Sequence, residues 1–208
     1  MNIGKHAALF FGIAILLLSA GCARYSARPL NRVVSPGIQQ TQSVACAYKP
    51  FDYNDCRTYL GRNVLAKGYQ PVNVTIYNNS DRYIKIAKTS INMHCVPAID
   101  VAKTVHTSTP KRAATYGILG LAIWPLLIPA VVEGMRSSLA NHKLDDDFLR
   151  KELADQTIAP YSSASGVIFI TTNEFKLSGQ KLKITTFDAV TSEPLVLSAT
   201  NHLLALNT

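Results

Sequence analysis

The chain has 208 residues, of which 21 are Lys or Arg and 13 are Asp or Glu, so its formal net charge is +8 at pH 7. This length suffices for one domain with a hydrophobic core, with or without a small insertion, and leaves no room for several large domains. The excess of basic residues favours partners with anionic surfaces.

The N-terminus has the features of an export signal. Lys5 provides a basic start, and residues 7–18 form an uncharged apolar stretch that is too short to span a bilayer. Residues 16–22 read Leu-Leu-Leu-Ser-Ala-Gly-Cys, with Ser19 at a position where Leu is usual. This run resembles the lipobox of bacterial lipoproteins, in which a signal peptidase cuts before the cysteine. The resemblance implies a signal peptide over residues 1–21 and lipidation, for instance by palmitate, at Cys22; the alternative is an ordinary signal peptide.

The residue after the cysteine bears on location. In lipoproteins of this kind an Asp there favours the inner membrane, whereas Ala23 implies the outer membrane, facing the periplasm. Two or more acyl chains would make the anchoring effectively permanent. A position in the envelope argues against nucleic acid as a partner, and leaves lipid headgroups, cell-wall carboxylates or other envelope proteins.

Residues 22–44 contain several Arg, Pro and Gly residues and no apolar period. We expect a flexible tether between the lipid and the fold. An extended segment of this length reaches up to about 65 to 70 Å.

Three further cysteines follow, Cys46, Cys56 and Cys95, an odd number in a compartment where disulfides persist. A bridge between Cys46 and Cys56 would stabilise the short loop that it closes by roughly 2 to 3 kcal/mol and is the favoured pairing; Cys56 with Cys95 is the alternative. His94 beside Cys95 lacks a second pair of ligands at a recognisable spacing, so no metal site is predicted.

Two segments are rich in β-strand patterns. Within residues 45–96, Val72, Val74 and Ile76 alternate with polar residues, and a turn-forming cluster at 78–81 separates them from a second alternating run, which predicts a hairpin. Residues 91–93 suggest a third short strand.

The second β-rich part covers residues 161–208, with candidate strands at 166–170, 182–187 and 195–197. Neither part alone has enough strands for a core, so we expect the two parts to pair with each other. The predicted class is α+β: an immunoglobulin-like β-sandwich with an inserted helical segment.

Residues 97–160 form that predicted helical insertion. Thr109 and Pro110 suit a helix start, and Asp145, Asp146 and Asp147 are expected to open a later helix, where carboxylates favour the positive end of the dipole.

The 20 residues 113–132 carry no charge, but Pro125 and Pro129 interrupt them. We expect an apolar helical hairpin with arms at 111–123 and 130–142. Three fates stay open for it: burial against its own sandwich, insertion into the bilayer, or docking into a partner or a second copy. The residues predicted to contact membrane or partner are Tyr116, Ile118, Leu119, Leu121, Trp124, Leu127 and Val131.

The motifs of common enzymes are missing from the sequence: it has no Gly-x-Ser-x-Gly, no His-Glu-x-x-His and no glycine-rich phosphate loop. We therefore expect no catalysis, no catalytic residues and no cofactor.

Several stretches carry a further resemblance: residues 55–56, 59–72, 78–81, 105–109 and 137–148. Over about residues 46–197 the chain resembles a little-characterised family of outer-membrane lipoproteins of intracellular bacteria, and it is similar to accessory lipoproteins of Dot/Icm-type (type IVB) secretion systems. The resemblance implies a structural subunit, with no functional residues to carry over beyond Cys22.

The sequence thus predicts an outer-membrane lipoprotein that acts as a structural or adaptor component of an envelope assembly, bound through its lipid and through protein–protein interaction or self-association of residues 113–132. Two alternatives stay open: a membrane-active or pore-forming lipoprotein that uses the hairpin, and a module that binds lipid or cell wall.

Overall fold

The computed structural model describes residues 25–34, 43–107, 127–198 and 200–201. The chain divides into two compact units, one made of Met1–Tyr25 and His106–Leu144, the other of Ser26–Val105 and Asp145–Thr208. The second unit contains all the described strands and is called the core unit below.

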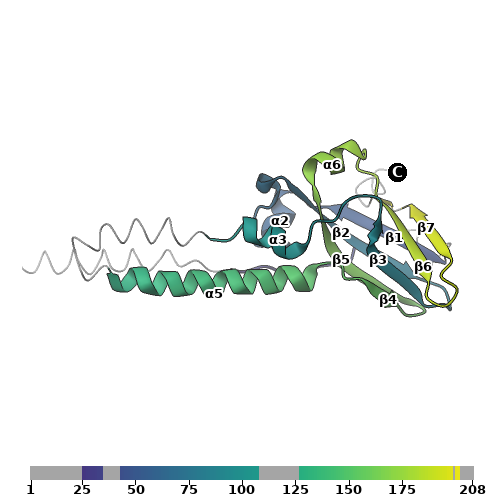
Figure 1. Cartoon of the computed structure of the whole chain (residues 1–208), viewed down its shortest axis with the longest axis horizontal. Coiled ribbons are helices and arrows are strands. Elements are labelled where there is room, and N and C mark those ends of the chain that lie inside the picture. Colours follow the sequence, from purple (N-terminus) through teal and green to yellow (C-terminus); the bar gives the residue numbers. More distant parts are fainter. Residues whose placement is uncertain (1–24, 35–42, 108–126, 199, 202–208) are drawn as a thin grey trace, which may run out of the picture. The chain divides into compact units, whose positions relative to one another are not determined.

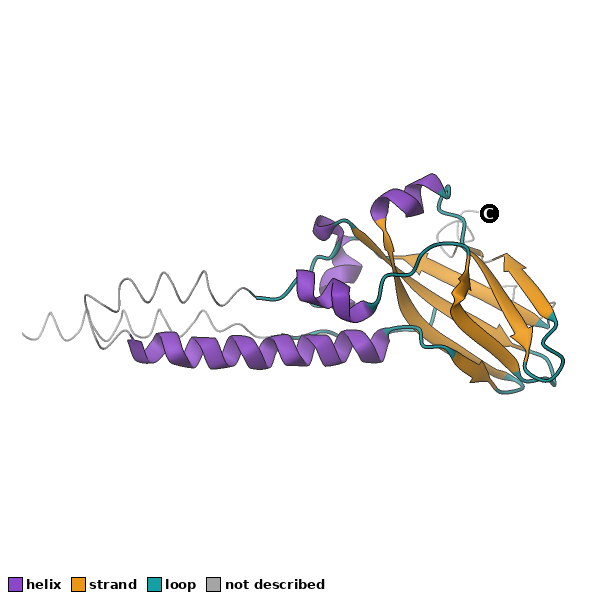
Figure 2. Ribbon diagram, in the orientation of Figure 1, coloured by secondary structure: helices purple, strands orange, loops and turns teal. Residues whose placement is uncertain are grey.

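The core unit contains two four-stranded sheets (Figures 1 and 2). The first has the order β5-β2-β1-β8, with β5 Ser162–Thr171, β2 Tyr69–Asn78, β1 Val44–Pro50 and β8 Thr200–Asn201. The second has the order β4-β3-β6-β7, with β4 Gln156–Ile158, β3 Ile84–Ile91, β6 Lys183–Asp188 and β7 Pro194–Ser198. Every neighbouring pair is antiparallel except β1 with β8.

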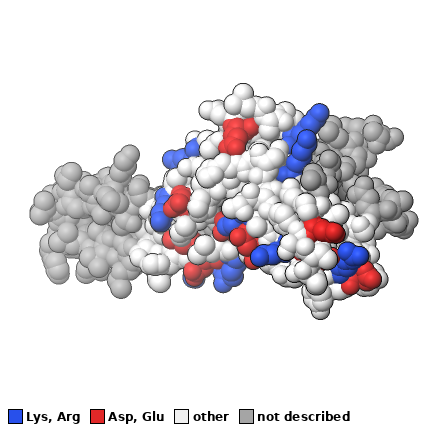
Figure 3. Space-filling model, turned by 45° about the vertical axis from the view of Figure 1, so that its right-hand side comes forward, with Lys and Arg blue, Asp and Glu red and all other residues white. Residues whose placement is uncertain are grey.

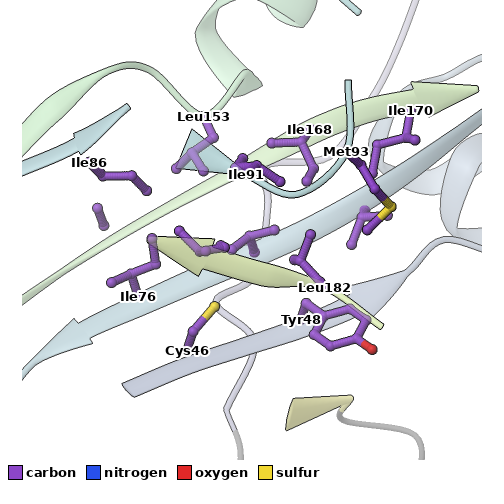
Figure 4. Close-up of a cluster of buried hydrophobic side chains, with 14 of the residues drawn as sticks. Cys46, Tyr48, Ile76, Ile86, Ile91, Met93, Leu153, Ile168, Ile170 and Leu182 are labelled. Atoms are coloured by element: carbon purple, nitrogen blue, oxygen red, sulfur yellow. The ribbon is translucent and has the colours of Figure 1, made fainter. Parts of the chain in front are cut away.

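Apolar residues at every second position of these strands form the core between the two sheets. In β2 the inward residues are Val72, Val74 and Ile76, and all three are fully buried. Figure 4 shows other members of the same cluster, among them Cys46 and Tyr48 from β1, Ile86 and Ile91 from β3, and Ile168 and Ile170 from β5. Burial of these side chains is the main source of stability for the pair of sheets.

The predicted pairing of the two β-rich parts is confirmed. β2 pairs along its whole length with β5, from Tyr69 opposite Thr171 to Asn78 opposite Ser162. β3 pairs with β6 at Ile84 to Ile86 and again at Ile91, with a register shift between these two places. The α+β class with antiparallel sheets is therefore correct.

The predicted hairpin between β2 and β3 is wrong, because these strands belong to different sheets. The turn-forming cluster at 78–81 does follow β2, but the chain uses it to cross from the first sheet to the second. Alternation of polar and apolar residues cannot distinguish these cases, because both strands present one apolar face to the same core.

Asn78 holds this crossing in place. Its side chain is fully buried, and its Nδ2 donates to the carbonyl oxygens of Arg82, Ile158 and Ala159 at 2.7, 3.2 and 2.9 Å. Its Oδ1 accepts from the backbone N–H and the hydroxyl of Ser80. One amide thus joins the β2–β3 crossing to the β4–β5 connection.

Short helices lie at the ends of the strands. They are α2 Tyr53–Tyr59, the 3-10 turn η1 Leu65–Lys67, α3 Ala98–Thr104 and α6 Thr172–Leu177. Helix α2 begins with a capping box in which Asp52 and Asp55 each accept a hydrogen bond from the backbone N–H of the other.

Helix α5, Leu127–Lys151, differs from the prediction. It runs without a break through the expected second arm of the hairpin and through Asp145 to Asp147, which therefore do not open a helix. Pro129 lies in the first described turn of α5, and the helix continues past it. The first predicted arm, 111–123, lies wholly outside the described residues, and no described helix is long and apolar enough to cross a membrane.

We expect Asn78→Ala to lower the free energy of unfolding by about 3 kcal/mol, because buried carbonyl groups that lose their donor each cost roughly 1 to 3 kcal/mol. Urea unfolding followed by circular dichroism measures this loss. The matched control is Asn54→Ala on the exposed side of α2, for which we expect a change within about 0.5 kcal/mol. Equal midpoints for the two variants would show that the crossing does not depend on the Asn78 amide.

Candidate functional site

Residues 26–34, called the strap below, lie on the outer face of the first sheet, the face turned away from the second sheet. Three outward residues of β2 hold the strap. Thr75 Oγ1 accepts from the Val33 N–H at 3.0 Å, the Tyr77 hydroxyl donates to the Val33 carbonyl at 2.6 Å, and Asn73 Nδ2 donates to the Asn31 carbonyl at 2.8 Å. Val33 itself is buried.

The beginning of the strap is attached to the end of α2. The Arg28 N–H donates to the Thr58 carbonyl at 2.8 Å, and Asn31 Nδ2 donates to the Tyr59 hydroxyl at 3.1 Å. The expectation of a flexible tether over residues 22–44 therefore needs correction, since 26–34 belong to the folded core. The sequence does not reveal the strap, because backbone groups of the strap make most of these contacts and backbone groups leave no pattern in the sequence.

A cleft of about 230 Å³ lies beside the strap. Arg32, Lys49, Tyr59 and Asn73 are among the residues that line it. Lys49 is engaged with Asp55, at 2.9 Å between Nζ and Oδ1. The Asn73 Oδ1 has no hydrogen-bond partner but is closed off from solvent, so a ligand in the cleft would not reach it.

A hollow of about 600 Å³ in the core unit includes Lys88, His94, Cys95 and Asp155 in its lining. Burial raises the pKa of the Cys95 thiol to about 11, so this group is protonated at neutral pH and is a weak nucleophile. The His94 N–H donates to Glu174 Oε1 at 2.7 Å. Within the part of the chain that the structure describes, no group of His, Cys, Asp and Glu is suited to hold a metal ion.

Cys46 and Cys56 are free thiols in the structure, as is Cys95, and the favoured Cys46–Cys56 disulfide stays a prediction. Cys46 points from β1 into the core between the sheets, whereas Cys56 lies in α2, beyond the end of that strand. Burial raises the pKa of both thiols to about 12.

At the opposite end of the strands from α2 and α3, three connections lie together: 79–83, 159–161 and 189–193, called the loop end below (Figure 1). The Tyr161 N–H donates to the Ser80 carbonyl at 3.3 Å, and the Ala189 N–H donates to the Tyr83 carbonyl at 2.8 Å. Three large side chains are exposed here, Tyr83 by 54%, Tyr161 by 75% and Val190 by 85%.

An ion pair also supports the loop end, with 3.3 Å between Arg82 Nη1 and Asp188 Oδ2. Backbone N–H groups of Thr191 and Val190 lower the pKa of Asp188, so its carboxylate stays charged at neutral pH. The sequence predicts a turn in the first of these loops but carries no signal that the three loops meet. Figure 3 shows acidic and basic side chains intermixed on the visible face, without a large patch of one sign.

The residues predicted to contact membrane or partner are mostly outside the described residues. This holds for Cys22, Tyr116, Ile118, Leu119, Leu121 and Trp124. Leu127 and Val131 lie in the first two turns of α5.

The core unit is thus an α+β structure of two sheets with a strap along one outer face. Comparison with family models, with curated proteins and with solved structures finds no match to this chain.

We expect the pair Thr75→Val and Tyr77→Phe to release the strap, because each substitution removes one hydrogen bond to Val33. At about 1 kcal/mol for each bond, the open population should rise roughly 30-fold. The measurement is the rate at which trypsin cuts between Arg32 and Val33 in the folded protein. Tyr69→Phe, at the other end of β2, is the control and should leave the rate unchanged; an equal rate for all proteins would contradict a docked strap.

We expect a thiol reagent to modify Cys95 first, because Cys95 is only partly buried whereas Cys46 and Cys56 are buried. The thiolate fraction, and so the rate, should rise about tenfold for each pH unit below the pKa near 11. Cys46 and Cys56 should react only after unfolding, as followed by peptide mass spectrometry. Recovery of a Cys46–Cys56 disulfide peptide without reduction would instead confirm the predicted bridge between these two residues.

Proposed function

We propose that this protein is a lipid-anchored structural or adaptor component of a bacterial cell envelope, without catalysis of its own. The observation that carries the proposal is the strap. Arg28, whose N–H is bound to the Thr58 carbonyl, follows the candidate acylation site Cys22 by six positions, so the segment that would emerge from the lipid is bound to the folded core after a short stretch. Such an arrangement suits a protein that holds its partners at a fixed place relative to the membrane.

The loop end supplies a surface for a protein partner. Tyr83 and Tyr161 are large amphipathic side chains that lose little conformational entropy on binding, and their loops are already joined by hydrogen bonds. Tyr161 has φ +51°, an uncommon conformation for a residue other than glycine. Residues 113–132 offer a second, apolar contact to membrane, partner or a second copy.

The remaining features of the sequence fit this proposal. The lipobox and Ala23 support the periplasmic face of the outer membrane, the resemblance to Dot/Icm-type accessory lipoproteins supports a place in a secretion system, and two facing sheets suit an immunoglobulin-like module. A membrane-active lipoprotein and a cell-wall-binding module are the competing functions.

The first test is the anchor. We expect Cys22→Ser to abolish incorporation of labelled palmitate and to move the protein from the membrane to the soluble fraction of host cells. Ser19→Leu, which restores the usual lipobox residue, is the control and should keep both properties. Labelling of the Cys22→Ser protein equal to that of the unmodified protein would refute lipidation at this residue.

The second test concerns the partner. Photo-crosslinkers at Tyr161 or Leu119, with Leu177 on the exposed side of α6 as control, should capture discrete envelope proteins in native membranes from the first two positions only. Capture of the same chain alone, together with dye leakage from liposomes, would favour a pore instead.

A further inference from the structure

Three segments of the core unit meet where α2 ends, at the end of the strands called the helical end below. The first part of the strap is bound there, because the Arg28 N–H donates to the Thr58 carbonyl. The last turn of α5 is bound to Tyr59, the residue after Thr58, since Lys151 Nζ donates to the Tyr59 carbonyl at 2.6 Å.

The segment that leads into α3 is bound at the same end. The Val96 N–H donates to the Phe169 carbonyl at 2.7 Å, and the Phe169 ring stacks on Phe148 of α5 with 5.5 Å between centroids. Because Phe169 pairs with Pro71 near the start of β2, these contacts lie at the helical end of β5. The chain leaves the core unit after Val105 and returns at Asp145, so both stems of the segment that contains the apolar residues 113–132 leave from the helical end.

The length of chain between the strap and the anchor limits where the core can be. Six residues separate Arg28 from Cys22, a reach of at most about 20 Å. The ten residues of β2 span about 33 Å from the helical end to the loop end. The acyl chains are therefore tethered to the helical end by less than the length of one strand.

The helical end carries exposed positive charge. Arg28 and Arg57 are both exposed, and among the described residues no carboxylate lies within ion-pair distance of either. Two nearby carboxylates have partners of their own, Asp55 with Lys49 and Asp147 with Lys151. Tyr53 of α2 is 52% exposed at the same end, and Tyr is a residue that favours the membrane–water interface.

We propose that the helical end of the core unit faces the bilayer that holds the acyl chains, and that Arg28 and Arg57 bind anionic phospholipid headgroups there. The inference rests on acylation of Cys22. It gives the protein an orientation: the strap, α2 and the stems of the apolar segment lie at the membrane, and the loop end with Tyr83 and Tyr161 points away from it.

The test uses the mature acylated protein in vesicles of phosphatidylethanolamine with phosphatidylglycerol. In a Cys95→Ser background, a nitroxide is attached at Tyr53→Cys or at Val190→Cys, and its collisions with a nickel-chelating lipid headgroup are measured. We expect several-fold more collisions at position 53 than at position 190. Equal collisions, or more at position 190, would overturn the orientation.

The headgroup contact is tested by Arg28→Gln with Arg57→Gln, neither of which removes a side-chain hydrogen bond seen in the structure. This pair should lower the collisions at position 53, and salt should do the same because it shortens the screening length from about 10 Å at 0.1 M to about 3 Å at 1 M. Lys85→Gln with Lys183→Gln, at exposed positions of the second sheet, is the control and should have no effect. No effect of the arginine pair would overturn headgroup binding.

The mass of the N-terminal peptide separates the two proposals. An unmodified Cys22 would refute the anchor and this orientation together. An acylated Cys22 with equal collisions at both labels would overturn the orientation alone.

Discussion

The two sheets depend on one buried amide. Asn78 continues the inward alternation of Val72, Val74 and Ile76, so its side chain lies between the sheets at the end of the core. There it satisfies carbonyl groups of the β2–β3 crossing and of the β4–β5 connection. An apolar residue of similar size would leave these carbonyls without donors, and a carboxylate would repel them. The hydrophobic core favours two facing sheets, whereas Asn78 specifies how the chain passes between them.

The part of this fold that the sequence predicts is the part that the alternation of polar and apolar residues along a strand can reveal. It reveals which side chains of a strand are buried, so β2, β3, β5 and the pairing of the two β-rich parts could be predicted. It does not reveal what covers the other face. Asn73 and Thr75 are polar but buried, because the strap covers them. Polar residues on one face of a strand therefore do not show that this face is exposed to solvent.

The helical part shows a second limit. Helix α5 includes residues that were predicted to begin a new helix, because three aspartates in succession suit an N-terminus. In the structure Asp147 instead forms an ion pair with Lys151, four residues later, with 2.6 Å between Oδ2 and Nζ. Lys151 Nζ also donates to the Tyr59 carbonyl. A run of carboxylates can therefore also lie inside a helix, where a basic residue one turn later pairs with one of them. As for the candidate site, sequence could point to Cys22 and to residues 113–132 but not to the loop end, which exists only after distant segments meet.

The return of the chain from the insertion to the sheets also depends on a close contact. A Cβ atom at Gly166 of β5 would lie 2.5 Å from the Leu153 Cα, closer than any stable contact. Leu153, two residues after α5, inserts into the core between the sheets and donates its N–H to the Val167 carbonyl. The segment after α5 thus lies along the outer edge of β5, where Val96 also forms a bridge to Phe169. Since Val96 precedes the insertion and Leu153 follows it, both stems are fixed to one strand. Both ends of the insertion are thus held by β5, which pairs with β2, the strand that holds the strap.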